Sequence, residues 1–246
     1  MTVPGHVVGY VEDIAASLAA VRADLVGVYL HGSAVLGGFD AARSDVDVLV
    51  VVSEPGEGAA RRRMGEAIAA TAARCPGAGL ELSVITAATA RELGDCPFEV
   101  HVNTTGAEPV IVPGAGPGGD LDLVLHAAVC RERGRAVLGP PPAEVFGSPP
   151  RQRILAAMAA DLRWAIDGGQ AAYAVLNACR AVRFAEESRL CSKVDGARWY
   201  LARHPDAATV TAALARHGGD GPGPSGERAL AFVEGCGLTR WAEQGR

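Results

Sequence analysis

The sequence predicts an α+β fold in which a sheet with flanking helices forms a first domain and helices alone form a second. Segments rich in β-branched residues alternate with helical segments up to about residue 147. From residue 148 onward, apolar residues recur only at helical spacing, which predicts an all-α bundle. Proline and glycine gather at 139–150, so we place the boundary there and expect domains at 1–147 and 148–246.

Each element of the first domain follows from a local pattern. Val11, Ile14 and Leu18 recur at helical spacing and predict an amphipathic helix at 9–22. The strand segments are short and apolar, and most end near glycine, proline or a polar bend. The predicted strands span 25–30, 46–52, 80–85, 98–102 and 110–112, and two further helices are predicted at 58–74 and 121–133.

The second domain shows helical patterns throughout. Its apolar residues recur every three or four positions, and no strand-like alternation interrupts them. The predicted helices span 154–166, 171–187, 193–203, 207–216 and 228–241. A loop rich in glycine and proline at 218–226 separates the last two.

Composition excludes several classes of protein. The 246 residues include 23 Lys or Arg and 28 Asp or Glu, a formal net charge of −5, which argues against a nucleic-acid partner because such proteins present basic surfaces. Neither a run of 18 apolar residues nor a basic N-terminal segment occurs, so we expect no membrane span and no signal peptide, and we expect a cytoplasmic protein. The six cysteines lack metal-site spacing and are expected to be reduced. We also expect a monomer.

The pattern that carries chemistry is Gly32-Ser33 after the first strand, followed eleven residues later by Asp45-Val46-Asp47 at the start of the second. Side chains at i and i+2 of a strand share a face, so the two carboxylates project together and repel each other unless a cation neutralises them. Ligands that are all oxygen suit Mg²⁺, which takes further ligands from substrate phosphates. The pattern therefore predicts a magnesium site that receives a nucleotide.

Two further features support a phosphate site beside this pair. Gly32 lets the backbone approach closely, and the hydroxyls of Ser33 and Ser44 can each contact a phosphate. Gly-Ser alone is typical of an ordinary turn, and the functional interpretation depends on the Asp-x-Asp pattern that follows it.

A third carboxylate, Glu81, lies in the third predicted strand between two leucines. By itself it suits a residue that faces solvent. Beside an Asp-x-Asp strand it is placed either as a third metal ligand or as a general base that takes a proton from an attacking hydroxyl. A metal-bound triphosphate, a base and an acceptor alcohol together predict a phosphoryl-type transfer.

Gly32-Ser33, Asp45-Val46-Asp47 and Glu81 resemble the motifs of the nucleotidyltransferase superfamily, whose members transfer a nucleoside monophosphate from a nucleoside triphosphate. The segments 31–52 (HGSAVLGGFDAARSDVDVLVVV) and 175–205 (VLNACRAVRFAEESRLCSKVDGARWYLARHP) resemble more narrowly the aminoglycoside (3'')(9)-adenylyltransferases. This resemblance implies a polymerase-β-like mixed sheet, a helical C-terminal domain and an active site in the cleft between them. It also implies transfer of AMP from ATP to a hydroxyl of a streptomycin- or spectinomycin-like antibiotic, release of pyrophosphate, and a role in antibiotic resistance.

The same resemblance assigns roles to individual residues. It implies that Asp45 and Asp47 hold Mg²⁺, that Glu81 is the catalytic base, and that Arg180 and Lys193 face the nucleotide. Lys193 is the only lysine of the chain and opens a predicted helix after Ser192, where phosphates bind well.

The acceptor is expected to be a small, hydroxylated and cationic molecule. A cationic drug requires carboxylates and aromatic rings, and around the start of the predicted helix at 171–187 the sequence departs from the family pattern. The candidate acceptor-binding residues are Trp164, Asp167, Gln170, Tyr173 and Glu99. Trp164 also suits the apolar core.

Two alternatives remain open from the sequence. In the first, the reaction is the same and the acceptor is another natural product or a protein side chain. In the second, the chain is a nucleotide-binding sensor without turnover. The presence of all three carboxylates disfavours the sensor, because a protein that only binds nucleotide has no need of a base.

Overall fold

The structure is a computed structural model that describes residues 3–114 and 119–237. The chain forms two compact units, residues 1–149 and 150–246. These limits lie two residues beyond the expected boundary at 147/148. The predicted α+β architecture, with a mixed sheet and a helical C-terminal part, is confirmed.

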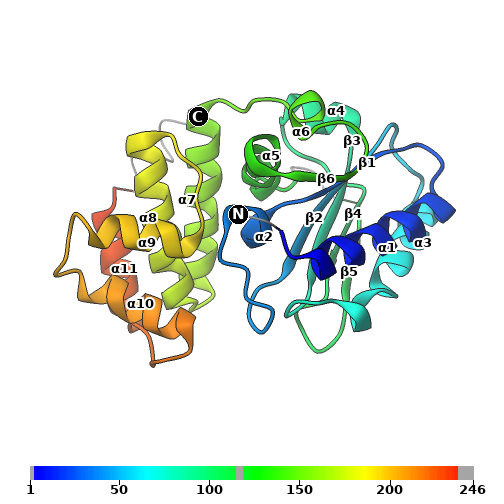
Figure 1. The fold of residues 1–246 in the computed structure, drawn as a ribbon. Helices are drawn as coiled ribbons and strands as arrows, with labels where there is room; N and C mark the ends of the chain where they lie inside the picture. Colours follow the sequence, from blue (N-terminus) through cyan, green and yellow to red (C-terminus); the bar gives the residue numbers. More distant parts are fainter. Residues whose placement is uncertain (1–2, 115–118, 238–246) are drawn as a thin grey trace. The chain divides into compact units, whose positions relative to one another are not determined.

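The first unit is built on a six-stranded sheet with the order β5-β4-β3-β2-β1-β6 (Figure 1). Among the strands of the described residues, β2 and β3 run parallel and every other neighbouring pair is antiparallel. The strands are β1 (Leu25–Leu30), β2 (Val46–Val52), β3 (Leu80–Thr86), β4 (Val100–Asn103), β5 (Val110–Pro113) and β6 (Arg135–Leu138). The central strand β2 is apolar on both faces after Asp47 and is buried along its length, as expected for a strand covered by helices on both sides.

One face of this sheet is covered by α1 (Gly5–Val21) and α3 (Gly58–Ala69). Alternate strand residues such as Val48, Val50 and Leu82 are fully buried there, against Ile14, Leu18 and Ile68 from the two helices among others. Because strand side chains alternate between faces, Asp47 and Glu81 belong to the opposite face. Two other helices, α2 (Gly32–Leu36) and α5 (Asp122–Arg133), contact β2 and each other.

Strands β1 and β2 match their predicted limits. The predicted segments 25–30 and 46–52 form β1 and β2 at full length, because apolar segments rich in valine suit buried strands. Several short elements had no predicted counterpart. They are the helices α2, α4 (Ala87–Glu92) and α6 (Pro142–Val145) and the edge strand β6.

The predicted helix at 58–74 is divided in the structure. The α-helix α3 ends at Ala69, and a 3₁₀ turn follows at Ala72–Arg74 (η1). The Thr71 hydroxyl donates a hydrogen bond to the carbonyl of Ile68 at 2.7 Å, which is the local competition with helical bonding that threonine offers near helix ends.

The second unit is a helical bundle organised around α8. Its helices are α7 (Arg151–Asp167), α8 (Ala171–Glu187), α9 (Lys193–Leu201), α10 (Ala208–Gly218) and α11 (Gly226–Gly235). The apolar residues Val175, Leu176 and Cys179 of α8 are buried against residues of α9, α10 and α11. The predicted last helix at 228–241 begins two residues earlier and ends at Gly235, and its positions 238–241 lie outside the described residues.

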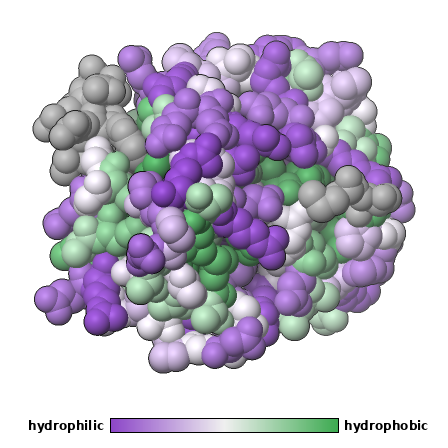
Figure 2. Space-filling view, turned by 60° about the vertical axis from the view of Figure 1, so that its left-hand side comes forward, coloured by the Kyte–Doolittle hydropathy of each residue, from purple (hydrophilic) through white to green (hydrophobic). Residues whose placement is uncertain are grey.

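Hydrophilic residues cover much of the face drawn in Figure 2, with smaller apolar areas between them. The exposed large hydrophobic residues of the described chain are scattered over five elements: Val21, Val110, Val112, Leu138, Trp164 and Leu230. Scattered exposure of this kind is ordinary for a folded protein. In the described ranges, every helix is too short or too polar to cross a membrane.

Candidate active site

The three predicted carboxylates lie together at one end of the first unit's sheet. Asp45 directly precedes β2, and Asp47 is the second residue of β2. Because β2 and β3 are parallel and in register, Asp47 stands directly beside Glu81. One carboxylate oxygen of each residue lies within 4.8 Å of the other two. We call these three residues the carboxylate trio.

The carboxylate trio fits a divalent cation. Three oxygen ligands at such spacing suit Mg²⁺, which accepts a few carboxylates and completes its octahedron with water or phosphate. Among the described residues, this is the one group of three or more Asp, Glu, His or Cys side chains close enough to share an ion. The folded chain therefore brings together negative charges that a cation can neutralise, as the sequence predicts for Asp45 and Asp47.

Gly32 closes one side of the carboxylate trio. It begins α2 with φ of 61°, in the left-handed region where glycine is favoured. A Cβ at this position would lie 1.7 Å from Oδ2 of Asp47, so no other residue fits without displacing that carboxylate. The adjacent His31 N–H donates to the Asp47 carbonyl at 2.9 Å, which holds the turn against β2.

Ser33 follows with a hydroxyl that has no partner. Its Oγ is buried and makes no hydrogen bond among the described residues. Such an unsatisfied group costs about 1–3 kcal/mol, and a phosphate oxygen would satisfy it. Ser44, in contrast, closes its own loop: its Oγ accepts the Asp40 N–H at 3.1 Å, and its N–H donates to the Asp40 carbonyl.

Burial and neighbouring charges set the protonation of the base candidate. Burial raises the pKa of Glu81, the positive His126 opposes that shift, and Asp45 adds to it. A raised pKa makes this carboxylate a stronger proton acceptor than a solvated one.

His126 of α5 is a candidate site residue that the sequence analysis did not select. Burial alone would lower its pKa, but the Asp122 carboxylate, 3.0 Å from its Nε2, raises the pKa to about 10, and Glu81 and Asp47 contribute to that shift. Its ring also packs on His31, with centroids 4.8 Å apart. The i, i+4 spacing of Asp122 and His126 on a predicted helix was the signal available in the sequence.

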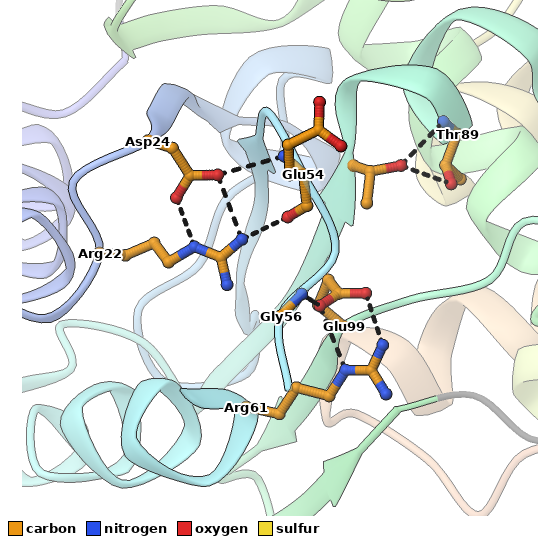
Figure 3. Close-up of polar contacts among 8 residues, drawn as sticks. Arg22, Asp24, Glu54, Gly56, Arg61, Thr89 and Glu99 are labelled. Atoms are coloured by element: carbon orange, nitrogen blue, oxygen red, sulfur yellow. Dashed lines mark hydrogen bonds and ion pairs between the residues drawn. The ribbon is translucent and has the colours of Figure 1, made fainter. Parts of the chain in front are cut away.

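Glu99, which the sequence predicts at the acceptor site, lies in the first unit within an internal ion pair. It directly precedes β4, and its N–H donates to the carbonyl of Val84, three residues after Glu81 in β3. Its side chain is only 6% exposed, and its carboxylate pairs with Arg61 through two hydrogen bonds of 2.9 and 3.1 Å and also accepts the Gly56 N–H (Figure 3). Both carboxylate oxygens are engaged in this internal pair, which joins α3 to the segment before β4.

The other acceptor candidates lie in the second unit around the junction of α7 and α8. Trp164 is 58% exposed, so the alternative of a core residue is wrong. Its ring meets that of Tyr173 edge to face, with centroids 6.1 Å apart. Asp167 ends α7 and Gln170 precedes α8, and both are exposed.

Both nucleotide-binding candidates of the second unit lie near the start of α9. Arg180 donates through Nε to the Cys191 carbonyl at 2.9 Å and through a terminal nitrogen to Oδ1 of Asn177 at 2.8 Å. Lys193 is the first residue of α9, and its Nζ lies 4.4 Å from the centre of the Tyr173 ring.

The predicted site residues thus form two groups, one in each unit. Gly32, Ser33, Asp45, Asp47 and Glu81 gather in the first unit, with Ser44 directly before Asp45. In the second unit, Tyr173 connects Trp164 to Lys193 through ring contacts.

Comparison with known proteins agrees with the resemblance inferred from the motifs. Residues 144–223 match the sequence model of the family described as aminoglycoside adenylyltransferase, C-terminal domain. No curated protein sequence matches the chain significantly. A crystal structure of spectinomycin adenyltransferase AAD(9) from Enterococcus faecialis, with ATP and spectinomycin, matches with a TM-score of 0.73 at 16% identity, over 95% of this chain and 98% of that one. The resemblance to the aminoglycoside adenylyltransferases is therefore confirmed by sequence over residues 144–223, and the solved structure shows the same fold over nearly the whole chain.

Proposed function

We propose that the protein is a Mg²⁺-dependent adenylyltransferase that moves AMP from ATP to a hydroxyl of a streptomycin- or spectinomycin-like aminoglycoside and releases pyrophosphate. The observation that carries this proposal is the carboxylate trio, with Gly32 leaving just enough room for the Asp47 carboxylate. The similarity of the helical unit to aminoglycoside adenylyltransferases supports the choice of reaction.

The carboxylate trio gives the first unit its chemical role. Asp45, Asp47 and Glu81 would hold the ion, and Mg²⁺ bound there neutralises charge on the triphosphate. The buried hydroxyl of Ser33 donates a hydrogen bond to a phosphate oxygen, which satisfies an atom that otherwise has no partner. The hydroxyl of Ser44 is proposed as a second phosphate contact, since its hydrogen bond with Asp40 uses it as an acceptor and leaves its proton to donate.

Glu81 has the second role in this proposal, as the general base. It accepts the proton of the acceptor hydroxyl while that oxygen attacks the α-phosphorus of ATP, and the bond from that phosphorus to pyrophosphate breaks. Its burial supports this role, because a desolvated carboxylate holds a proton more strongly.

Arg180 and Lys193 are proposed to bind the nucleotide, and this assignment derives from the family resemblance. Their placement supports it in part, since Lys193 opens α9 and Arg180 is bonded to the Cys191 carbonyl two residues before it. A helix start beside a lysine offers both N–H groups and a positive charge to phosphate.

The acceptor is proposed to be a small cationic molecule with free hydroxyls, bound with the help of the exposed Trp164 ring, the partly buried Tyr173 ring, Asp167 and Gln170. The structurally similar AAD(9) was crystallised with spectinomycin. Inactivation of such a drug would make the protein an antibiotic-resistance enzyme. The net charge of −5 supports the absence of a nucleic-acid partner.

Mass spectrometry of the products tests this function. The protein is incubated with ATP, Mg²⁺ and one drug, in separate reactions for streptomycin and spectinomycin. We expect an AMP adduct on at least one drug together with released pyrophosphate. If neither drug gains an adduct while the same preparation releases pyrophosphate with a different acceptor, the proposed acceptor class is wrong. If ATP binds and no pyrophosphate is released, the nucleotide sensor is favoured.

A further inference from the structure

We propose that Tyr173 is a positioning residue that holds the ammonium of Lys193 in place for the nucleotide phosphates. The proposal rests on the proposed role of Lys193 in nucleotide binding and adds a residue that acts through it. All the contacts that carry it lie within the second unit, between the helices α7, α8 and α9.

The first observation is the contact between the two side chains. Nζ of Lys193 lies 4.4 Å from the centre of the Tyr173 ring, inside the range of a favourable cation–π interaction. Lysine has a flexible four-carbon stem and loses much rotamer freedom when its charge is fixed. A ring that already restricts the ammonium lowers the entropy that must be lost when an anion binds.

The second observation is that the ring itself is held by hydrogen bonds. The Tyr173 hydroxyl donates to Oδ1 of Asp161 at 3.1 Å, and the other carboxylate oxygen of Asp161 accepts from Nδ2 of Asn177 at 3.0 Å. An aromatic ring with both a packed body and a bonded hydroxyl has little freedom to turn. The position of the ring therefore fixes where its face meets Lys193.

The third observation connects the same network to Arg180. Oδ1 of Asn177 accepts a hydrogen bond from Arg180 at 2.8 Å, and Arg180 also donates to the Cys191 carbonyl, just before α9. A Cβ at Gly196 of α9 would lie 2.9 Å from Cγ of Arg180, so α9 packs directly on this side chain. One connected network thus restrains both cations assigned to the nucleotide.

A spectroscopic test uses the fact that Lys193 is the only lysine of the chain. Reductive methylation with ¹³C-formaldehyde labels this amine and the N-terminal amine, keeps their charge, and the Lys193→Arg variant identifies which signal is which. We expect the Lys193 methyl signal to be shifted upfield by the Tyr173 ring. The shift should disappear in Tyr173→Leu and persist in Tyr173→Phe, which keeps the ring. The same signal in the wild type and in Tyr173→Leu would overturn the proposal.

A binding test asks whether the contact matters for the nucleotide. Loss of a cation–π contact predicts a dissociation constant for ATP, measured with Mg²⁺ by calorimetry, that rises about 2- to 5-fold in Tyr173→Leu. The rise should be smaller in Tyr173→Phe, which keeps the ring and loses only the hydroxyl bond to Asp161. Tyr200→Leu is the matched control, because it removes a ring of the same unit that packs on His204 and Phe232, and it should retain the wild-type constant.

The outcomes separate this proposal from the proposed function. An unchanged constant in Tyr173→Leu, alongside a clear increase in Lys193→Ala, would overturn the positioning role and leave nucleotide binding by Lys193 standing. An unchanged constant in Lys193→Ala would overturn the assignment of Lys193 itself.

Discussion

Gly32 and Asp47 approach each other so closely that only a glycine fits at position 32, where a Cβ would lie 1.7 Å from the Asp47 carboxylate oxygen. A residue with a side chain would also have to adopt φ of 61°, which costs about 1–2 kcal/mol outside glycine. The turn that carries Ser33 and the strand that carries Asp47 are thus in direct steric contact.

We therefore predict that Gly32→Ala lowers the free energy of unfolding by at least about 1–2 kcal/mol, because alanine disfavours the left-handed conformation. The variant should also lose nearly all transfer activity. Urea denaturation and product assays measure the two effects. Gly9→Ala in α1, where a Cβ meets nothing within 4 Å, is the control and should be neutral or stabilising. An active Gly32→Ala enzyme would mean that the Asp47 carboxylate tolerates displacement.

Mg²⁺ should stabilise the folded protein through the carboxylate trio. Binding to the native state alone adds about 1.4 kcal/mol when the ion is at ten times its dissociation constant, so the melting temperature should rise with Mg²⁺ concentration. Asp47→Asn should lose this response. Asp206→Asn, an exposed carboxylate outside the trio, should keep it, and a response retained by Asp47→Asn would place the ion elsewhere.

Because of His126, we predict that the free energy of unfolding falls as pH rises in the absence of Mg²⁺. Its pKa of about 10 in the folded chain exceeds the ordinary histidine value near 6.5, so above pH 6.5 the folded state retains a proton that the unfolded state has lost. The contribution is complete below pH 6.5 and is lost as pH rises toward 10.

The useful window for this measurement is pH 7 to 8. At higher pH the buried thiols, whose pKa values are raised by burial, add a slope of the same sign once cysteines ionise in the unfolded chain. Within the window, denaturant titrations should show a loss of order 1 kcal/mol per pH unit that His126→Leu removes. An equal slope in the variant would assign it to other groups.

Glu99 should matter for stability and not for the acceptor. Its pair with Arg61 is largely buried, so Glu99→Gln should lose about 1–3 kcal/mol of unfolding free energy while the KM for the drug stays at the wild-type value. Asp13→Asn breaks a pair with Arg74 that is more than half exposed on both sides, and it should change stability by less than about 0.5 kcal/mol. A raised KM in Glu99→Gln would restore Glu99 to the acceptor site.

The sequence predicted the strands that carry the carboxylate trio because their patterns are local. The valine-rich apolar segment 46–52 identifies β2, and the two-residue period places Asp45 and Asp47 on one face. Glu81 became interpretable only beside that pair, and the parallel register of β2 and β3 supplies the contact.

What the sequence missed depends on contacts between distant positions. The four-residue strand β6 exists because its backbone pairs with β1, and nothing within the segment 135–138 signals that pairing. The pairing of Glu99 with Arg61, 38 residues away, likewise follows from no local pattern. The bonds from Asp161 to Tyr173 and Asn177 likewise join α7 to α8 and leave no local pattern.

The most direct measurement compares the wild type with Glu81→Gln in one reaction containing ATP, Mg²⁺ and the drug that the wild type modifies. The substitution keeps the size of the side chain and removes its ability to accept a proton, so calorimetry should show that ATP still binds while mass spectrometry shows that the AMP adduct is lost. Adduct formation by Glu81→Gln at the wild-type rate would contradict the central claim that this carboxylate at the metal site carries the transfer.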